Sequence, residues 1–210
     1  MSINLEELNS INNLLKQNTK TGLLIVTKNR NISDINQLIN LGYTNFGENK
    51  VQEAKNKFQS ITNDNLNLHL IGPLQTNKVK DALKIFNVIQ SLDRIKLVDE
   101  IVKLKSKSDF IKTSEFFIQV NIGDEDQKSG VTALDLNQFY HYCLSNGLNI
   151  VGLMCIPPVN KDPIKFFKKM ITLKNDLNKK LLLSMGMSND YKEAIKCESN
   201  LVRIGSKIFS

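Results

Sequence analysis

A lysine ends an apolar run in the segment LLIVTK, residues 23–28. The run is typical of a buried strand in a parallel sheet, where an unpaired ammonium group would be costly to bury. One interpretation is that Lys28 only marks the point where the strand reaches water. The other is chemical, because a lysine amine in a pocket that excludes water, beside a second cation, is a nucleophile that forms a Schiff base with an aldehyde.

Two turns near the end of the chain carry groups that bind phosphate. The first reads SMGMSND and begins at Ser184, and the second reads RIGSK and contains Arg203, Gly205 and Ser206. Glycine lets backbone N–H groups approach an anion closely, and serine hydroxyls add donors. Either turn alone could be an ordinary connection with a helix cap. Together they predict a phosphate site formed by Ser184, Gly205 and Ser206.

A ligand with both an aldehyde and a phosphate would suit Lys28 and these turns, and pyridoxal 5'-phosphate is a cofactor of that kind. The alternative from the chemistry alone is an aldolase that forms a Schiff base with a sugar phosphate. Such an aldolase usually has its lysine deeper in the sequence, among acid–base carboxylates, whereas Lys28 lies on the first predicted strand. The sequence therefore favours a pyridoxal phosphate site.

Short apolar runs alternate with longer amphipathic segments along the chain. Strands are predicted at 22–27, 43–46, 67–71, 86–90, 115–121, 148–153, 180–184 and 199–204. Helices are predicted at 3–18, 33–41, 49–59, 76–84, 93–106, 132–145, 161–178 and 189–196, with a last helical turn after Gly205. Eight strands separated by helices predict a (β/α)8 TIM barrel with an extra N-terminal helix. An open doubly wound sheet is the alternative, but TKNRN after the first strand lacks the glycines of a dinucleotide site.

In a barrel of this kind, sites form where the carboxyl ends of the strands meet. Side chains alternate along a strand, so Lys28, Ser184 and Arg203 each share a face with a leucine two or four positions earlier. If those faces line the interior, the three polar side chains converge on one mouth of the barrel. A lysine and an arginine pointing there would require an anionic or polar ligand between them.

The composition excludes several classes of protein. The chain has 210 residues, 41% of them hydrophobic and 23% charged, which predicts one soluble globular domain over 1–210. No apolar run is long enough to cross a membrane, and the polar N-terminus does not resemble a signal peptide. Cys143, Cys155 and Cys197 show neither a disulfide framework nor metal-ligand spacing, which favours a reducing cytoplasm and no metal.

The net charge of +7 could indicate a nucleic-acid partner. However, the lysines are spread along the chain, and the arginines are confined to Arg30, Arg94 and Arg203. No stretch combines basic and aromatic residues in the way that nucleic-acid-binding segments do. We therefore predict no nucleic-acid partner.

Taken together, the motifs resemble the YggS/PROSC family of pyridoxal-phosphate-binding proteins, also called pyridoxal phosphate homeostasis proteins. The resemblance covers residues 23–209. The motifs that carry it are IVTK, NFGENKVQEA, HLIGPLQTNK, SLDR, VNIGDEDQKSGV, GLMCIPP, LSMGMSND and LVRIGSKIF. The resemblance implies a barrel similar to the N-terminal domain of alanine racemase.

The resemblance also implies roles for the residues already singled out. Lys28 corresponds to the Schiff-base lysine, and Arg203 to an arginine near the pyridine nitrogen of the cofactor. A permanently charged guanidinium disfavours protonation of that nitrogen and makes the ring a weaker electron sink. The phosphate would be held by Ser184, Gly205 and Ser206.

Other residues of the matching motifs have less definite roles. By the same resemblance, Asn49 corresponds to a residue that contacts the side of the cofactor ring. Met154 either contacts the cofactor or is only part of the barrel core. His69 lies in an apolar strand and is more readily explained as a core histidine. Asn77 suits the start of a helix. Lys50 follows GEN where an aromatic residue or arginine is common in relatives, so it could alter the edge of the site.

Two classes of function remain. Racemases with a similar barrel need a second base, typically a tyrosine from a separate domain, and no tyrosine of this chain follows a predicted strand end. The resemblance therefore implies a monomeric, non-catalytic carrier or buffer of pyridoxal phosphate, with PLP-dependent apoenzymes as possible recipients. A minimal pyridoxal-phosphate-dependent amino-acid racemase is the alternative.

Overall fold

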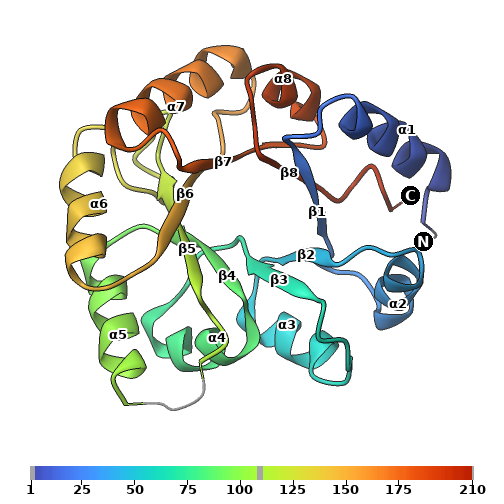
Figure 1. Cartoon of the computed structure of the whole chain (residues 1–210), viewed down its shortest axis with the longest axis horizontal. Helices are drawn as coiled ribbons and strands as arrows, with labels where there is room; N and C mark the ends of the chain where they lie inside the picture. Colours follow the sequence, from blue (N-terminus) through green and yellow to red (C-terminus); the bar gives the residue numbers. More distant parts are fainter. Residues whose placement is uncertain (1–2, 108–110, 210) are drawn as a thin grey trace.

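A closed barrel of eight parallel strands forms the centre of the protein, in a computed structural model that describes residues 3–107 and 111–209. Each strand pairs with its sequence neighbours, and β8 pairs with β1 to close the ring. Figure 1 looks along the barrel, with the helices outside the strands. The prediction of a (β/α)8 barrel is confirmed.

The elements alternate as the apolar pattern predicts. The strands are β1 (Gly22–Val26), β2 (Asn45–Glu48), β3 (Asn67–Leu70), β4 (Val88–Leu92), β5 (Glu115–Val120), β6 (Ile150–Cys155), β7 (Leu182–Met187) and β8 (Leu201–Ile204). The helices are α1 (Leu5–Lys16), α2 (Ile32–Asn40), α3 (Val51–Phe58), the 3-10 turn η1 (Thr76–Lys78), α4 (Val79–Ile85), α5 (Ile95–Lys105), α6 (Leu136–Ser145), α7 (Pro163–Leu177) and α8 (Tyr191–Lys196).

Helix α1 takes the place that a helix after β8 would occupy. In Figure 1 it lies on the outside of the barrel between α8 and α2. Its buried side chains Leu8 and Ile11 are three residues apart and face the barrel. The N-terminal segment also pairs with the end of the chain, because the Asn4 amide donates to the Ile208 carbonyl at 2.7 Å. The extra N-terminal helix is therefore part of the outer layer.

Two apolar layers hold the strands in place. The larger lies between the strands and the helices and includes Ile25, Phe116 and Leu153. The smaller is formed by Val88, Phe117 and Met154, whose positions in β4, β5 and β6 alternate with those of the outer layer. These three side chains therefore form an apolar cluster inside the barrel.

Gly152 makes room for this interior packing. A Cβ atom at position 152 would lie 2.4 Å from the Phe117 ring and 2.5 Å from the Leu182 carbonyl oxygen. The absence of a side chain on β6 thus allows an aromatic ring from β5 to enter the barrel.

Strand β7 departs from its predicted bounds. The sequence predicts a strand at 180–184, but β7 runs from Leu182 to Met187. Residues 178–181 form a turn instead, with the Leu181 amide donating to the Asn178 carbonyl at 3.0 Å. The register against β8 shifts between Ser184 and Met187, with one extra residue in β7. Gly186, with φ +95°, lies in this bulge rather than in a terminal turn, so Ser184 lies within the strand.

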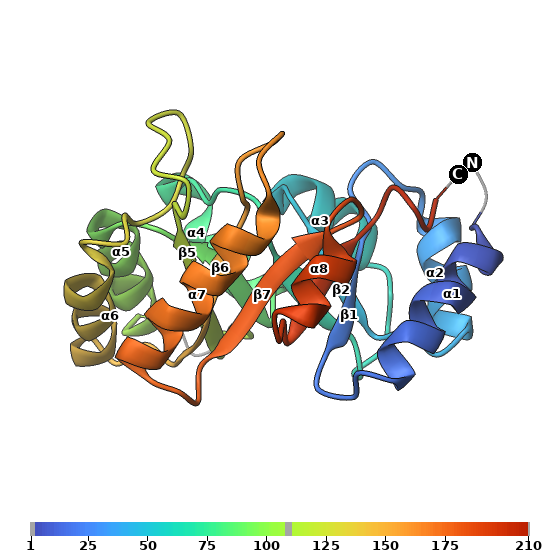
Figure 2. The same ribbon diagram turned by 90° about the horizontal axis from the view of Figure 1, so that it is seen from above.

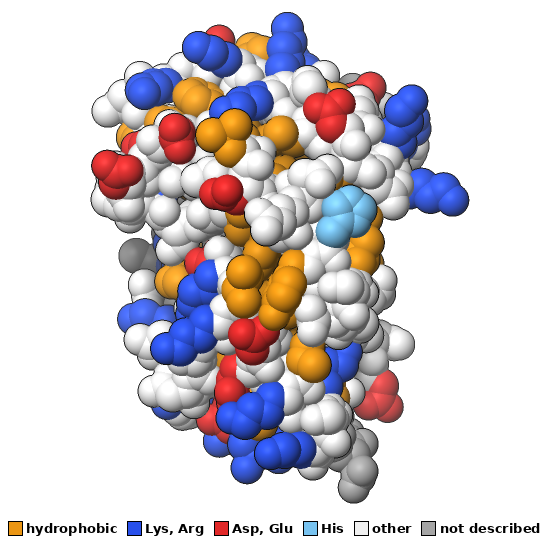
Figure 3. Space-filling model, turned by 90° about the vertical axis from the view of Figure 1, so that its left-hand side faces the viewer, with side chains coloured by type: hydrophobic (Ala, Val, Ile, Leu, Met, Phe, Trp, Pro, Cys, Tyr) orange, Lys and Arg blue, Asp and Glu red, His pale blue; other side chains and the backbone are white. Residues whose placement is uncertain are grey.

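The distribution of charge on the surface and the character of the helices bear on the predictions about nucleic acid and membranes. Figure 3 shows one face of the molecule, where Lys and Arg side chains of the described residues are interspersed with acidic and apolar ones. Within residues 3–107 and 111–209, none of the helices combines the length and the apolar character that a membrane crossing needs.

Candidate functional site

The carboxyl ends of the strands meet at one edge of the barrel, here called the carboxyl rim. Figure 2 shows the barrel from the side, with the connections that follow β5 and β6 standing above the rest of this rim. Lys128 ties the first connection to the second, because its ammonium group donates to the Pro157 carbonyl at 3.2 Å. The rim is therefore taller over β5 and β6 than over β1, β2 and β8.

Lys28 lies on this rim, two residues beyond the end of β1. Its side chain is exposed. The turn that carries it, residues 27–30, is closed by the Arg30 amide, which donates to the Thr27 carbonyl at 3.0 Å. Asn29 adopts a left-handed conformation with φ +58°, which asparagine tolerates better than most residues. The amine is thus accessible, and its backbone is held in a defined turn.

Arg203 lies on β8 and points into the barrel, where only 3% of its surface is exposed. Its guanidinium donates to the Ser184 carbonyl at 2.6 Å, to the Ser184 hydroxyl at 2.8 Å and to the Cys155 carbonyl at 2.7 Å. Burial lowers the pKa of the guanidinium, although an arginine remains protonated at neutral pH. The structure therefore holds a fixed positive charge inside the barrel.

A chain of hydrogen bonds continues from Arg203 across the interior. The Ser184 hydroxyl donates to Gln90 Oε1 at 2.6 Å, and Gln90 Nε2 lies 2.8 Å from His69 Nδ1. Since the amide nitrogen donates, Nδ1 of His69 accepts and the ring proton is on Nε2. Within the described chain, His69 Nε2 is buried and has no hydrogen-bond partner. The hydrogen bonds all donate in the same direction, from Arg203 through Ser184 and Gln90 to a neutral His69.

Burial of His69 makes the stability of the protein depend on pH. Burial lowers its pKa from 6.5 to about 4, so the folded state favours the neutral ring. The contribution of the neutral ring to the free energy of unfolding is fully present above pH 6.5. As the pH falls below that value, His69 in the unfolded state takes up a proton. The His69 contribution is therefore lost between pH 6.5 and 4, with a total of about 3 kcal/mol.

We expect His69→Gln to remove this part of the pH dependence, because glutamine still offers Gln90 a partner but does not titrate. Urea unfolding of wild type and variant at pH 7.5 and pH 4 measures the effect. The free energy of unfolding of the wild type is expected to fall more than that of the variant, by about 3 kcal/mol. Equal losses in both proteins would show that His69 titrates normally.

The other predicted residues divide into two groups. Asn49 directly follows β2 and is half-buried, and Gly205 and Ser206 directly follow β8, with Ser206 exposed. These three residues lie on the carboxyl rim with Lys28. Met154 is fully buried in the interior apolar layer.

The structure does not bring Ser184 to the phosphate turn, contrary to the sequence prediction. Its hydroxyl is fully buried, and both Gln90 and Arg203 bond to it. The physical reason is the length of β7, which continues three residues beyond Ser184. This serine therefore supports the guanidinium of Arg203.

Gly205 brings the ends of β8 and β1 together. A Cβ atom at this position would lie 2.9 Å from the Val26 carbonyl oxygen, so a larger residue would push the two strands apart. After Gly205 the chain makes a helical turn, in which the Ile208 amide donates to the Gly205 carbonyl at 2.8 Å. The first N–H groups of such a turn have no partner within it. A turn of this kind is suited to bind an anion.

Two features of the site escaped sequence reasoning. Gln90 is a polar residue in a mostly apolar predicted strand, which is the signal that the sequence offers, and the structure buries it completely. Lys57 follows Val51 and Ala54 at intervals of three on the buried face of α3. A lysine in that apolar stripe requires buried partners, and it has them beside Lys28.

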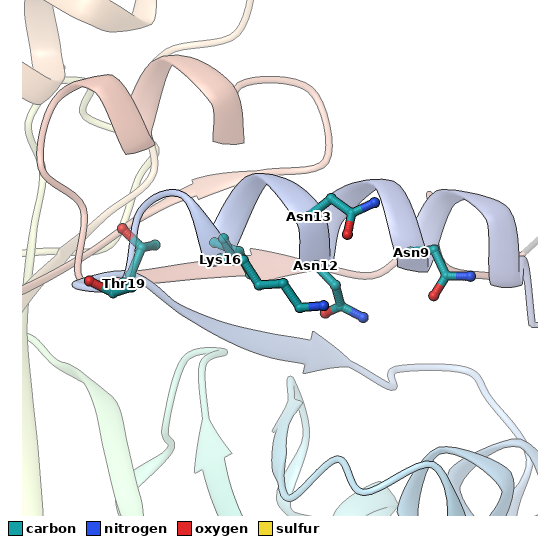
Figure 4. Close-up of a pocket in the computed structure, with 7 residues that line it drawn as sticks. Asn9, Asn12, Asn13, Lys16 and Thr19 are labelled. Carbon is teal, nitrogen blue, oxygen red and sulfur yellow. The ribbon is translucent and has the colours of Figure 1, made fainter.

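A hollow beside α1 is a second place where polar side chains gather. Figure 4 shows Asn9, Asn12, Asn13, Lys16 and Thr19 along the helix and the turn that follows it. The hollow also includes Thr21, which leads into the amino end of β1. It therefore lies at the opposite end of β1 from Lys28 and is separate from the carboxyl rim.

The geometry of the rim suits a small ligand that carries an aldehyde and a negative charge. Lys28 offers an accessible amine, Arg203 offers a fixed positive charge below it, and the turn after Gly205 offers backbone donors. The unpartnered Nε2 of His69 adds a buried donor in the interior. These residues fit pyridoxal phosphate.

Comparisons with known proteins agree with this assignment. No protein-family model matches the chain. A pyridoxal phosphate homeostasis protein of Pasteurella multocida is 38% identical over 205 residues, which cover 89% of this chain and 84% of that protein. The proteins of the same name from Haemophilus influenzae and Aquifex aeolicus are 38% and 37% identical and cover 92% and 83% of this chain and 85% and 80% of their own lengths.

Solved structures give the same result. PipY of Synechococcus elongatus without PLP matches with a TM-score of 0.88 and 28% identity, covering 98% of this chain and 99% of PipY. PipY with PLP bound matches with a TM-score of 0.84 and 27% identity over the same shares of the two chains. Alanine racemase of Corynebacterium glutamicum shares the fold, with a TM-score of 0.70 and 15% identity, and the match covers 99% of this chain and 61% of the racemase. This chain belongs to the family of pyridoxal phosphate homeostasis proteins.

Proposed function

We propose that the protein holds pyridoxal 5'-phosphate through a reversible imine bond on Lys28 and acts as a carrier or buffer of this cofactor. The observation that carries the proposal is the placement of an exposed amine just beyond the end of β1 and a buried guanidinium on the adjacent strand β8. A solved relative with PLP bound supports the choice of ligand.

Each residue of the site has a part in this proposal. The Lys28 nitrogen bonds to the aldehyde carbon, and the aldehyde oxygen leaves as water with the two amine hydrogens. Water reverses the same reaction, which gives release. Arg203 would supply a fixed positive charge to the cofactor and would disfavour protonation of its ring nitrogen. The backbone amides after Gly205, with the Ser206 hydroxyl, hold the phosphate.

The remaining predicted residues have supporting parts. Asn49, which directly follows β2, would contact the cofactor ring, and Met154, buried in the interior apolar layer, would provide an apolar contact to it. Ser184 keeps the guanidinium of Arg203 in position through the two hydrogen bonds described above.

The proposal includes a carrier role without substantial turnover. The curated relatives are named as homeostasis proteins rather than as racemases. A reversible imine protects a reactive aldehyde and can deliver it, so PLP-dependent apoenzymes are the recipients that we propose. We also propose that the protein acts as a monomer in the cytoplasm, where its cysteines, which are free and buried, stay reduced. A minimal amino-acid racemase is the second candidate.

The proposal is tested by loading the purified protein with pyridoxal phosphate and recording its visible spectrum. We expect an imine absorbance band, which borohydride reduction converts into a stable secondary amine. Peptide mapping then identifies the labelled residue. Recovery of the label on a lysine other than Lys28 would contradict the assignment.

We expect Ser206→Asp to weaken binding of pyridoxal phosphate strongly, because a carboxylate would lie beside the phosphate. The loss is on the order of tenfold or more, since two like charges at contact distance repel by about 1 kcal/mol or more even in water. Titration of the visible band with the cofactor measures it. Pyridoxal without the phosphate should bind equally well to both proteins. Ser145→Asp on α6 makes the same change of charge far from the rim and serves as the control. Equal affinity of Ser206→Asp and wild type for the phosphorylated ligand would count against the phosphate site.

A further inference from the structure

A buried ion cluster lies directly beneath the turn that carries Lys28. It consists of Lys57 and Glu53 on α3, Glu48 at the end of β2, and Thr27, and we call it the Lys57 cluster. The Lys57 ammonium group donates to Glu48 Oε1 at 2.9 Å and to Glu53 Oε1 at 2.6 Å. The Lys57 side chain is 10% exposed and that of Glu48 is 0% exposed. The ammonium group is thus almost removed from water and depends on these carboxylates.

The Lys57 cluster forms hydrogen bonds with the main chain on both sides of Lys28. The third hydrogen bond of Lys57 goes to the Thr27 carbonyl oxygen at 2.6 Å. On the other side, the backbone amide of Asn29 donates to Glu53 Oε1. The residues before and after Lys28 are therefore bound to the same pair of charged side chains.

Glu48 fastens the cluster to the barrel. The Thr27 hydroxyl donates to Glu48 Oε1 at 2.7 Å, and the Thr27 amide donates to the Gly47 carbonyl at 3.0 Å. Burial raises the pKa of Glu48, against the effect of hydrogen bonds from Thr27 and Lys57. Burial also tends to raise the pKa of Glu53. Hydrogen bonds from Lys57 and the Asn29 amide outweigh this effect, so the pKa of Glu53 is lowered. Such a costly arrangement of charges requires an explanation beyond packing.

Lys28 itself needs this support because of its position. It lies outside the strand, and Asn29 beside it has the left-handed backbone described above. A lysine side chain has four carbon–carbon bonds about which it rotates, so the place of its amine depends on where the backbone is held. An error of about 1 Å in the position of a reacting group can slow a reaction on the order of a hundredfold.

We propose that Lys57, together with Glu53 and Glu48, is a positioning unit that fixes the backbone around Lys28 and thereby sets the rate at which this lysine forms and releases its imine bond. The inference rests on the proposed function, because it assigns to the cluster the control of the same lysine. The cluster acts through the turn and does not touch the ligand.

Lys55 provides a matched control on the same helix. It lies two residues before Lys57 but faces outward, with a side chain 45% exposed and an ion pair to Asp81 at 3.9 Å. Lys57→Met and Lys55→Met therefore remove the same charge from the same helix. Only the first variant removes the bond to the Thr27 carbonyl.

The first measurement is amide hydrogen exchange of residues 27–30 in protein without ligand. We expect faster exchange of the Asn29 amide in Lys57→Met and in Glu53→Ala, and wild-type exchange in Lys55→Met. Glu53→Gln keeps an oxygen for the Asn29 amide and is expected to lie between wild type and Glu53→Ala. Unchanged exchange in both Lys57→Met and Glu53→Ala would overturn the positioning role.

The second measurement is the rate of imine formation with pyridoxal phosphate and with pyridoxal. We expect Lys57→Met to react on the order of tenfold to a hundredfold more slowly with both aldehydes, in the same ratio, because the lysine and not the phosphate turn is disturbed. Ser206→Asp differs, since only the phosphorylated ligand is affected. Should Lys57→Met fail to fold, Glu53→Ala takes its place, because the Glu53 side chain is 21% exposed and its truncation is less disruptive.

The outcomes separate the two proposals. If borohydride labels a lysine other than Lys28 in the wild type, the proposed function fails. If Lys28 is labelled in the wild type and the folded Lys57→Met or Glu53→Ala protein reacts as fast as Lys55→Met, the proposed function stands and the inference about the Lys57 cluster is wrong.

Discussion

Replacing Lys28 by alanine is expected to abolish the imine absorbance of the loaded protein completely. The amine is the atom that would bond to the aldehyde carbon, and alanine has no nucleophile to replace it. The fold should survive, because the Lys28 side chain is exposed and lies beyond the end of β1. Surface substitutions of this kind usually change stability by no more than about 0.5 kcal/mol.

The measurement combines the visible spectrum with borohydride labelling and thermal unfolding. Lys20→Ala is the matched control, since Lys20 is also exposed but precedes β1 at the opposite end of the barrel. The control should keep the full absorbance. A Lys28→Ala protein that is folded and still gives a reducible band at wild-type intensity would remove the basis of the proposed function.

The sequence was sufficient to predict the barrel because the pattern of the strands is regular. Each strand has a buried run, and the runs are separated by amphipathic segments long enough to return the chain to the same end. The interior positions also follow from alternation, as Arg203 on β8 illustrates, whose side chain points into the barrel as predicted. These features depend on local periodicity alone.

The bounds of β7 could not be predicted, for a physical reason. A glycine in SMGMSND suggests a turn, but Gly186 lies in a bulge where β7 has one more residue than β8. Whether a glycine ends a strand or bulges within it depends on the neighbouring strand. Because the predicted strand ended at Ser184, the prediction placed this serine on the rim and assigned it a phosphate contact. In the structure it lies in the interior.

The Lys57 cluster was also beyond sequence reasoning, although a signal was present. A lysine at intervals of three from Val51 and Ala54 marks a buried charge on α3. Its partners come from the turn after β1, from β2 and from the same helix, and only the closed barrel brings these segments together. Local pattern can therefore show that a buried charge needs partners, but the partners are a property of the fold.

Racemisation of alanine by the loaded protein is expected to be orders of magnitude slower than catalysis by a dedicated racemase. When bound, the cofactor makes the α-hydrogen of an amino acid acidic, but fast racemisation needs a base on each face of the substrate. Lys28 can serve one face. If Arg203 lies near the ring nitrogen as proposed, it would further limit the reaction, since a guanidinium there makes the ring a weaker electron sink.

The tyrosines of the described chain do not offer the second base. The Tyr142 hydroxyl donates to Asp99 at 2.6 Å, and the Tyr43 hydroxyl accepts from Asn12 at 2.5 Å, both in the outer layer of helices. Tyr140 and Tyr191 are buried in the apolar layer between strands and helices. None of the four is among the residues that directly follow a strand on the carboxyl rim.

An acid–base group typically contributes about 10²–10⁴-fold to a rate, so the lack of one predicts turnover far below roughly 1–10³ per second. The test incubates loaded protein with L-alanine and follows D-alanine, with free pyridoxal phosphate and Lys28→Ala as baselines. Turnover within that enzymatic range would establish the racemase alternative and overturn the carrier role. Transfer of the cofactor to an apoenzyme, without such turnover, is the result that we expect, because the reversible bond proposed on Lys28 would be sufficient to store and release an aldehyde without a second base.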